Sequence, residues 1–264
     1  MSEARFALVT GASGGIGRAI AEQLARRGLR IAVHWFQRLD AAESTLRAVR
    51  EAGSDGRLFQ ADLADRLACR ELIEQVWDWA GRIDLHVQAA GADVLTGEAR
   101  QLPFDEKLDR LWSVDVAGTV HCCRAMGRRM YEQHDAAYRP SITTIGWDQS
   151  EIGMERDAGE LFATVKAGVA AFTRSLAHSL APRVRVNCVA PGWIRTAWGR
   201  TAAPHWEARA TSQALLNRWG TPQDVAAVVA FLASPDADFI NGQVVAVNGG
   251  FRTYVPRLDD GPGS

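Results

Sequence analysis

The chain has 264 residues, of which 47% are hydrophobic and 23% are charged, and its net charge of −1 gives no reason to expect nucleic acid or an anionic membrane as a partner. Its four cysteines show no C-x-x-C spacing, which predicts reduced thiols and argues against a disulfide framework or a zinc site. The first residues lack an apolar signal segment and no apolar run reaches membrane-spanning length, so we expect a cytoplasmic protein without a membrane partner.

Short apolar runs alternate with amphipathic stretches along the chain. The first strand is predicted to begin at Phe6. Six further strands are predicted at 30–34, 58–60, 83–87, 141–145, 184–189 and 244–247. Helices are predicted at 18–27, 40–52, 66–80, 103–131, 160–181 and 222–233. This alternation predicts an α/β fold: a doubly wound, Rossmann-type parallel sheet of about seven strands with helices on both faces.

Neither a proline- or serine-rich linker nor an internal repeat divides the chain. We therefore expect one domain over 1–251, with an irregular, partly helical insertion at about 193–221. Residues 252–264 read as a C-terminal tail that is mobile at least at its end.

The stretch from Thr10 to Gly17 reads as a glycine-rich turn between the first strand and the first helix. It fits the pattern T-G-x-x-x-G-x-G but not G-x-G-x-x-G, because Ser13 stands where the second glycine of that pattern belongs. Free N–H groups at the helix start make an anion site suited to a pyrophosphate, while the alternative is an ordinary glycine-rich turn. The candidate contacts are Gly11, Ser13, Gly14, Gly15, Ile16 and Gly17.

In a sheet of this kind, ligands lie at the carboxyl ends of the strands. After the second strand, no acid at 34–38 is available for a ribose 2′-OH, and Arg38 suits a 2′-phosphate, which favours NADP over NAD. Alternatively, Arg38 is a solvated surface charge. Asp62 and Leu63 suit an adenine contact, although Asp62 equally suits a helix cap. Ala90 and Gly91 are small enough for a cofactor to pass.

Together with further motifs, these features resemble the short-chain dehydrogenase/reductase family over nearly the whole chain. The resemblance implies a doubly wound fold, a nicotinamide dinucleotide, hydride transfer at a carbonyl or alcohol carbon, and a homo-oligomer, usually a dimer or tetramer. The motifs are Thr10-Gly11-x-x-x-Gly15-x-Gly17, Asp62-Leu63, Ala89-Ala90-Gly91 in place of N-N-A-G, Lys166-Ala167-Gly168, Arg185 to Gly192, Asn241-Gly242-Gln243 and Asn248-Gly249-Gly250.

The resemblance also implies a catalytic set of Asn, Ser, Tyr and Lys. In the family, Tyr transfers the proton, Lys lowers the pKa of that Tyr and holds the ribose, Ser orients the carbonyl, and Asn helps to position a relay water. Carried over to this chain, Lys166 is present, but Phe162 stands at the Tyr position, Trp147 at the Ser position and Asp115 at the Asn position. Phenylalanine cannot exchange a proton, so another group must act or no proton moves.

Four acids lie in the loop that borders this site: Asp148, Glu151, Asp157 and Glu160. A carboxyl group beside Trp147 and Phe162 would be desolvated, and its pKa raised as a general acid requires. We select Asp148 because it directly follows Trp147, whereas the alternative for each acid is a solvated loop charge. Asp115 is expected either to pair with Lys166 or to bond only to backbone or water.

The segment after the sixth strand completes the expected site. The resemblance assigns cofactor contacts to Pro191, Gly192, Ile194 and Thr196, in addition to Lys166. Several tryptophans follow, and we expect Trp193 and Trp198, with Trp147 and Phe162, to line an aromatic substrate pocket. The alternative is that these tryptophans pack the loop onto the body of the domain. No histidine spacing suggests a metal site.

The combined expectation is an NADP-preferring oxidoreductase that acts on a small molecule with a modified proton-transfer apparatus. It would act on a C=N or C=C bond of its substrate, or on a substrate that supplies its own acidic group. The first alternative is a dinucleotide-binding protein without turnover, and the second is non-redox chemistry such as dehydration or isomerisation. Fold alone does not decide among these functions.

Overall fold

The computed structural model describes residues 4–133, 139–200 and 202–252. Its centre is one seven-stranded sheet in which every neighbouring pair is parallel, in the order β3-β2-β1-β4-β5-β6-β7. The strands are β1 (Phe6–Thr10), β2 (Arg30–Trp35), β3 (Gly56–Gln60), β4 (Leu85–Gln88), β5 (Ser141–Ile145), β6 (Arg185–Pro191) and β7 (Val244–Val247).

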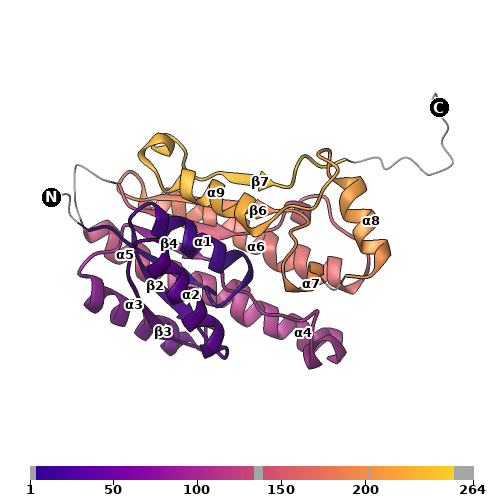
Figure 1. Cartoon of the computed structure of the whole chain (residues 1–264), viewed down its shortest axis with the longest axis horizontal. Helices are drawn as coiled ribbons and strands as arrows, with labels where there is room; N and C mark the ends of the chain where they lie inside the picture. The colour runs from indigo at the N-terminus through magenta and orange to yellow at the C-terminus, as the bar shows by residue number, and fades with distance from the viewer. Residues whose placement is uncertain (1–3, 134–138, 201, 253–264) are drawn as a thin grey trace.

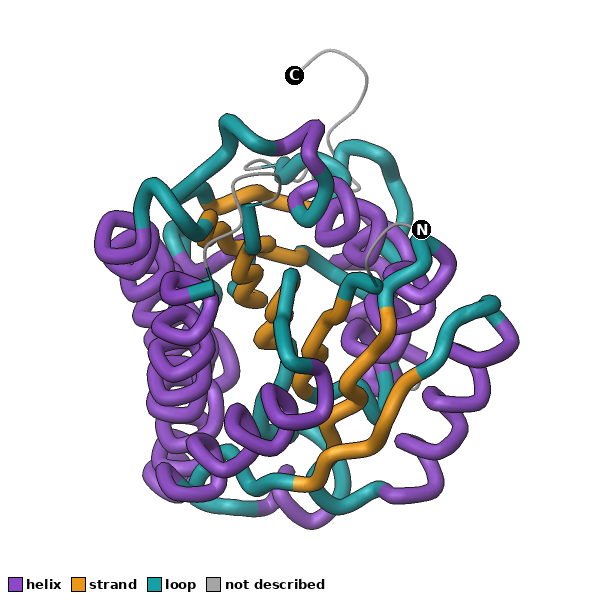
Figure 2. The backbone as a smooth tube through the Cα atoms, turned by 90° about the vertical axis from the view of Figure 1, so that its left-hand side faces the viewer, coloured by secondary structure: helices purple, strands orange, loops and turns teal. Residues whose placement is uncertain are grey.

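Helices cover both faces of this sheet (Figure 2). Alternate residues of β1 point to opposite faces, so that Ala7 and Val9 pack against one helical layer and Phe6 and Leu8 against the other. The first layer contains α1 (Gly15–Arg26), α2 (Leu39–Glu51) and α9 (Pro222–Leu232). The second contains α3 (Arg66–Ala80), α5 (Thr119–Glu132) and α6 (Arg156–Leu180). The predicted fold class is confirmed.

The parallel arrangement brings the loops that follow the strands to one edge of the sheet. The insertion after β6 forms α7 (Ala197–Arg200) and α8 (Pro204–Gln213) at this edge. In Figure 1 these helices lie at the right-hand end of the molecule, together with α4 (Phe104–Leu111). Short 3-10 turns occur at η1 (Glu98–Gln101), η3 (Asp148–Ser150) and η4 (Pro235–Ala237).

The predicted single α-helix over 103–131 is wrong in its middle. The chain forms α4, then a π-helical segment, η2 (Trp112–Gly118), and then α5, with helical backbone angles at both junctions. A π segment inserts an extra residue into a helix and is common at functional sites. Here it carries Asp115, which is turned inward and buried.

The start of the predicted tail is attached to the domain. The N–H of Arg252 donates to the carbonyl of Gln213 at 2.8 Å, and Phe251 forms a β-bridge with Ala214. Residues 253–264, the remainder of that tail, lie outside the described residues. Within the described ranges, no helix has the combination of length and apolarity that crossing a bilayer requires.

Candidate functional site

The glycine turn is shaped by close backbone packing. Gly11 and Gly15 have positive φ angles of 65° and 56°, which favour glycine. A Cβ atom on Gly11 would lie 2.7 Å from the Cα of Ala90, and one on Gly17 would lie 2.4 Å from the carbonyl oxygen of Gly11. The turn is therefore held tightly against both the end of β4 and the start of α1.

The first turn of α1 is open to an anion. Gly14 precedes the helix without a capping side chain, and the first turn contains no acidic residue. The N–H groups at the helix start are thus available as donors, reinforced by the helix dipole. This arrangement fits a pyrophosphate, as the sequence predicts.

Arg38 lies directly against this turn. Its guanidinium Nη2 atom is 3.1 Å from the position that a Cβ atom on Gly14 would take, although Arg38 precedes α2 and is exposed. A guanidinium group is well suited to bind a phosphate in a bidentate manner. The placement therefore fits a 2′-phosphate beside the glycine turn.

Thr10 and His34 fix the turn from within. The Oγ1 atom of Thr10 accepts hydrogen bonds from the N–H groups of Ala89 and Ala90, at 3.0 and 3.1 Å. The ring of His34 accepts from the Gly11 N–H through Nδ1 at 3.0 Å, and its Nε2 lies 3.1 Å from the carbonyl of Ala61. This ring therefore joins the ends of β1, β2 and β3.

Burial keeps His34 neutral. It lowers the pKa of the imidazole to about 4, against the opposing effects of the Ala61 carbonyl and the Asp62 carboxylate. Because the unfolded chain would titrate near 6.5, it binds more protons than the folded chain between that value and about 4. The contribution of His34 to stability is thus present above 6.5 and is lost as pH falls through this window.

Asp62 does not cap the next helix. Its Oδ1 atom accepts from the N–H of Ala64 at 2.9 Å, whereas Asp65 caps α3 by accepting from the N–H of Leu67 at 2.7 Å. That alternative for Asp62 is therefore wrong. Leu63 is buried, and its carbonyl would be 2.6 Å from a Cβ atom on Gly118.

Lys166 and Asp115 form a buried ion pair. The Nζ atom of Lys166 is 2.8 Å from Oδ2 of Asp115, with side-chain exposures of 13% and 2%. Oδ1 of Asp115 accepts from the N–H of Ala92 at 2.8 Å, and Lys166 also donates to the carbonyl of Ile145 at 3.2 Å. An ammonium group has three N–H donors, so one remains to reach a ligand such as a ribose.

Trp147 and Phe162 pack together, and Phe162 lies about one helical turn before Lys166 in α6. Their rings pack edge to face with centroids 6.3 Å apart. Phe162 also packs on an apolar cluster formed by Val94, Leu111, Leu161 and Val165. Both rings therefore belong to an apolar packing arrangement, and their place in a substrate pocket stays a prediction.

Asp148 is the half-buried carboxyl group of the neighbouring loop. Its Oδ2 atom accepts from Nδ2 of Asn248 at 3.0 Å and would lie 3.0 Å from a Cβ atom on Gly192. Its Oδ1 atom is buried without a hydrogen-bond partner among the described residues. Burial raises the pKa of Asp148 to about 6, against the lowering effects of the Asn248 hydrogen bond and nearby backbone N–H groups.

The other acids of the loop have different surroundings. Glu151 pairs with Arg174 at 3.1 Å, whereas Asp157 and Glu160 are exposed in the first turns of α6. Glu155 forms an ion pair with Arg209 of α8, and this contact lowers the pKa of Glu155 to about 2. Asp148 is thus the half-buried acid of this group, and burial raises its pKa.

The segment after β6 lies across from the glycine turn. Thr196 approaches it most closely, since its Cγ2 atom would be 3.8 Å from a Cβ atom on Gly15. Ile194 is buried and forms a β-bridge with Gly220. Pro191 ends β6, and the N–H of Gly192 donates to the carbonyl of Val247 at 3.1 Å.

Tryptophans of the insertion pack mainly on one another. Trp193 lies between Trp206 and Trp219, with ring centroids 5.6 and 6.0 Å away, and its Nε1 donates to Gln213 at 2.9 Å. Trp219 is buried. These contacts favour the packing alternative for Trp193 and Trp219, and a substrate contact of Trp193 stays a prediction. Trp198 falls in α7, and its side chain lies outside the described part of the structure.

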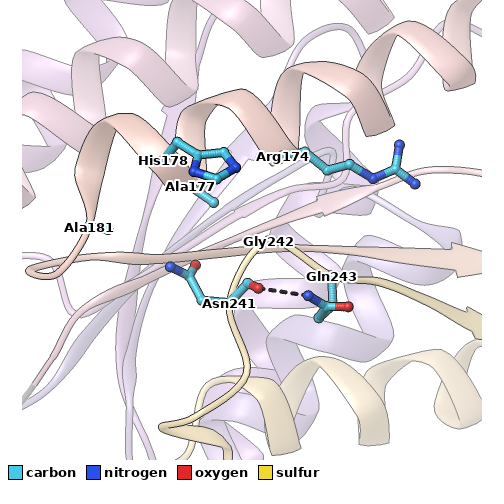
Figure 3. Close-up of a pocket in the computed structure, with 7 residues that line it drawn as sticks. All are labelled: Arg174, Ala177, His178, Ala181, Asn241, Gly242 and Gln243. Carbon is cyan, nitrogen blue, oxygen red and sulfur yellow. Dashed lines mark hydrogen bonds between the residues drawn. The ribbon is translucent and has the colours of Figure 1, made fainter.

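A separate pocket of about 270 Å³ lies between α6 and the segment that precedes β7 (Figure 3). Its amide groups already serve the fold: Asn241 Oδ1 accepts from the N–H of Val186 at 2.8 Å, and Gln243 Nε2 donates to the carbonyl of Asn241 at 2.9 Å. Because this segment precedes a parallel strand, the pocket is at the opposite edge of the sheet from the glycine turn.

Known proteins resemble this chain in sequence and in fold. A family model described as enoyl-(acyl carrier protein) reductase matches residues 11–252. A cyclohexanol dehydrogenase from Rhodococcus sp. is 37% identical over 269 residues, covering 95% of this chain and 96% of that protein. A 3-oxoacyl-(acyl-carrier-protein) reductase from Staphylococcus aureus is 33% identical over 253 residues, covering 95% and 99%. The structure of a short chain dehydrogenase from Burkholderia cenocepacia in complex with NADP superimposes with a TM-score of 0.82 at 30% identity, covering 93% and 97%.

The chain belongs to the short-chain dehydrogenase/reductase family. This confirms the family resemblance and the expected nicotinamide dinucleotide, NADP or NAD, at the level of the family. The relatives given above are named as dehydrogenases and reductases, so the family to which the chain belongs is one of oxidoreductases.

Sequence patterns do not single out two polar contacts of this short-chain dehydrogenase/reductase. His34 appears only as a polar residue at the end of an apolar strand, and Asn248 only as part of a motif. Nothing local indicates that the first bonds to Gly11 or that the second bonds to Asp148 across 100 residues. Both contacts arise from the order of strands in the sheet.

We predict that the two amide replacements of His34 differ in cofactor binding. His34→Asn keeps an acceptor near the position of Nδ1, whereas His34→Gln keeps a polar group near Nε2 and loses the contact to Gly11. Since one hydrogen bond is worth about 1 kcal/mol, NADPH should bind roughly fivefold more weakly to the Gln variant than to the Asn variant.

Nucleotide fluorescence titration measures these affinities, and thermal unfolding provides the control. Each variant loses one of the two ring contacts, so their melting temperatures should fall by similar amounts. Equal NADPH affinities in the two variants would show that the Gly11 contact does not position the turn.

Proposed function

We propose that the protein is a cytoplasmic, NADP-preferring oxidoreductase that transfers a hydride between the nicotinamide and a small organic substrate, with Asp148 as the proton-transferring group. The observation that carries this proposal is the position of Asp148. It is a half-buried carboxyl beside Gly192, with a pKa near 6, on the sheet edge that also bears the glycine turn and Lys166. A general acid needs such a pKa close to the working pH.

When bound, the cofactor supplies the hydride. The residues of the chain bind and orient it: the glycine turn and the start of α1 hold the pyrophosphate, Arg38 meets the 2′-phosphate, and the free N–H of Lys166 reaches the ribose. Asp115 holds the Lys166 ammonium in place through its 2.8 Å contact. Ile194 and Thr196 complete the cofactor contacts from the segment after β6.

We expect NADPH to bind more tightly than NADH because Arg38 lies on the glycine turn and no acid at 34–38 can accept from a ribose hydroxyl. Arg38→Ala should weaken NADPH binding roughly tenfold or more and leave NADH binding nearly unchanged. Arg47→Ala removes an exposed cation from α2, the helix that follows Arg38, and serves as the control. Fluorescence titration with both nucleotides measures the preference, and an unchanged NADPH affinity in the Arg38 variant would contradict it.

The proposed site lacks the hydroxyl donors that carbonyl reduction uses in this family. Reduction of a carbonyl builds negative charge on its oxygen, and donors aimed at that oxygen stabilise it. Phe162 offers no donor, and Trp147 offers at most one indole N–H. Loss of a positioned acid costs roughly 10²–10⁴-fold in rate, and loss of one oxyanion donor roughly 10²–10³-fold. Ketones and alcohols should therefore be poor substrates.

Two variants test the proton-transferring group. Asp148→Asn should abolish the native NADPH oxidation and leave NADPH affinity unchanged, whereas Asp157→Asn, at an exposed acid in the first turn of α6, should change neither. With a neutral substrate, turnover should fall as pH rises through about 6, because the raised pKa of Asp148 leaves the acid form below that value.

The double variant Phe162→Tyr with Trp147→Ser tests the opposite case. If no group has replaced the family's donors, this variant should gain carbonyl reductase activity beside Lys166. The unaltered protein should then reduce none of the acceptors tested and leave NADPH unoxidised. That outcome would favour a dinucleotide-binding protein without turnover. A panel of ketones, imines and enones, followed by NADPH absorbance, distinguishes the two cases, and rapid ketone reduction by the unaltered protein contradicts both.

We also propose a homo-oligomer, a tetramer or a dimer, because the family shares helices between subunits. Two helical units are expected at this interface. One is the interrupted helix formed by α4, η2 and α5, and the other is α6. Trp112, a large apolar residue of η2, is 51% exposed in the single chain and is available for such an interface. Light scattering at micromolar concentration should give a multiple of the 28.8 kDa chain mass, and a monomer mass would refute the proposal.

A further inference from the structure

One ion pair joins two segments at the carboxyl edge of the sheet. Glu155 ends the loop between β5 and α6, whereas Arg209 belongs to α8, which follows β6. Nη2 of Arg209 donates to Oε2 of Glu155 at 3.0 Å, and Nη1 donates to Oε1 of the same carboxylate. The contact is bidentate, which is the geometry that best matches a guanidinium group to a carboxylate.

Two indole rings fix the same guanidinium group. The Cζ atom of Arg209 lies 5.5 Å from the ring centroid of Trp206 in α8 and 5.9 Å from that of Trp193. A guanidinium group within about 6 Å of an aromatic face is attracted to it. Since Trp193 lies just after the end of β6, Arg209 holds together α8, the start of the insertion and the neighbouring loop.

The backbone next to Glu155 is strained. Arg156 has a positive φ angle of 70°, which residues with a side chain rarely adopt. A conformation of this kind persists where the surrounding contacts hold it. The ion pair of the preceding residue is such a contact, so we expect the loop to change conformation when the pair breaks.

A second ion pair of the insertion stays within it. Arg195 pairs with Glu207 at 2.6 Å, and both residues lie between β6 and the end of α8. Among the residues that the structure describes, Glu155–Arg209 is the ion pair that ties the insertion to the loop between β5 and α6. The two pairs therefore differ in what they connect, although their chemistry is the same.

The tied segment also carries expected cofactor contacts. Ile194 and Thr196 follow Trp193, and the Cγ2 atom of Thr196 would lie 3.8 Å from a Cβ atom on Gly15 in the glycine turn. The backbone between these residues is short, so a shift of Trp193 would move this side of the cofactor site with it. The tie at α8 is in this way connected to the segment that faces the glycine turn.

The exposure of the pair allows it to open. The side chains of Glu155 and Arg209 are 61% and 25% exposed, so water can replace their contact at little cost. The buried pair between Lys166 and Asp115 would not release so readily, because each charge would lose its partner away from water. The Glu155–Arg209 pair is therefore suited to a closed state that opens repeatedly.

We propose that Arg209 is a positioning residue that keeps the start of the insertion closed over the bound dinucleotide through its contact with Glu155. Breaking of this contact then allows the dinucleotide to leave. The inference rests on the function proposed above for the identity of the ligand, NADPH. In many enzymes the opening of such a segment, and not the chemical step, limits turnover.

Stopped-flow fluorescence measures how fast NADPH dissociates when an excess of NADP displaces it. Glu155→Gln removes the charge and keeps the shape of the side chain, so dissociation should become roughly 5–10-fold faster. The association rate should change by roughly twofold or less, because the contact forms after the cofactor has entered. A general loss of structure would instead lower the melting temperature and the fraction of protein that binds NADPH.

A double-mutant cycle assigns the effect to the pair. Arg209→Gln removes both the ion pair and the contact with the indole rings, so NADPH should dissociate at least as fast as from Glu155→Gln. Adding Glu155→Gln to Arg209→Gln should have no further effect, because the partner is already absent. Glu207→Gln breaks an exposed ion pair inside the insertion and is the matched control, which should leave the dissociation rate unchanged.

The possible failures are distinguishable. If Glu155→Gln and the unaltered protein release NADPH at the same rate, or if the two substitutions of the cycle act additively, the inference is overturned while the function proposed above stands. An equal acceleration in Glu207→Gln also overturns the inference, because any ion pair of the insertion would then have the same effect. If the unaltered protein does not bind NADPH, the function proposed above is overturned, and this inference with it.

Discussion

The buried ion pair between Lys166 and Asp115 is the contact on which the geometry of this site depends. It joins α6 to the π-helical segment η2, and through its second contacts it also reaches the ends of β5 and β4. Four elements that are distant in sequence thus meet at two charged side chains. Removal of either partner would leave the other charge buried, which typically costs about 3–5 kcal/mol.

The π segment is the local consequence of this pairing. Asp115 occupies a helix that would otherwise continue unbroken from α4 into α5, and the wider turn brings its carboxylate to Lys166 and to the N–H of Ala92. Apolar periodicity predicts the helix but not the interruption, because the extra residue follows from a tertiary contact that no local pattern contains. The sequence does indicate the two residues of the ion pair, because the family resemblance places Asp115 and Lys166 at two positions of one catalytic site.

In the rest of the fold, too, local sequence patterns predict the elements but not the tertiary contacts between them. Alternation of apolar runs and helices was enough for the doubly wound sheet, and the glycine turn was found because close packing requires glycine at Gly11 and Gly17. The tie from His34 to that turn, and the contact from Asn248 to Asp148, depend on which strands become neighbours. The apolar periodicity of the sequence predicts the strands and helices. The order of the strands in the sheet decides which polar groups come into contact.

Charge neutrality then links the fold to its chemistry. A lysine that is free to act on a substrate must retain unpaired positive charge, whereas Lys166 shares its charge with Asp115. Buried ion pairs contribute little net stability compared with apolar packing, so this pair is better explained by the orientation it gives Lys166 than by stability. Trp147 and Phe162 offer no hydroxyl group, so the proposed proton transfer depends on the half-buried Asp148, whose pKa is raised by burial. The ion pair and this carboxyl thus have separate parts in the proposed site: the first orients Lys166, and the second supplies the proton.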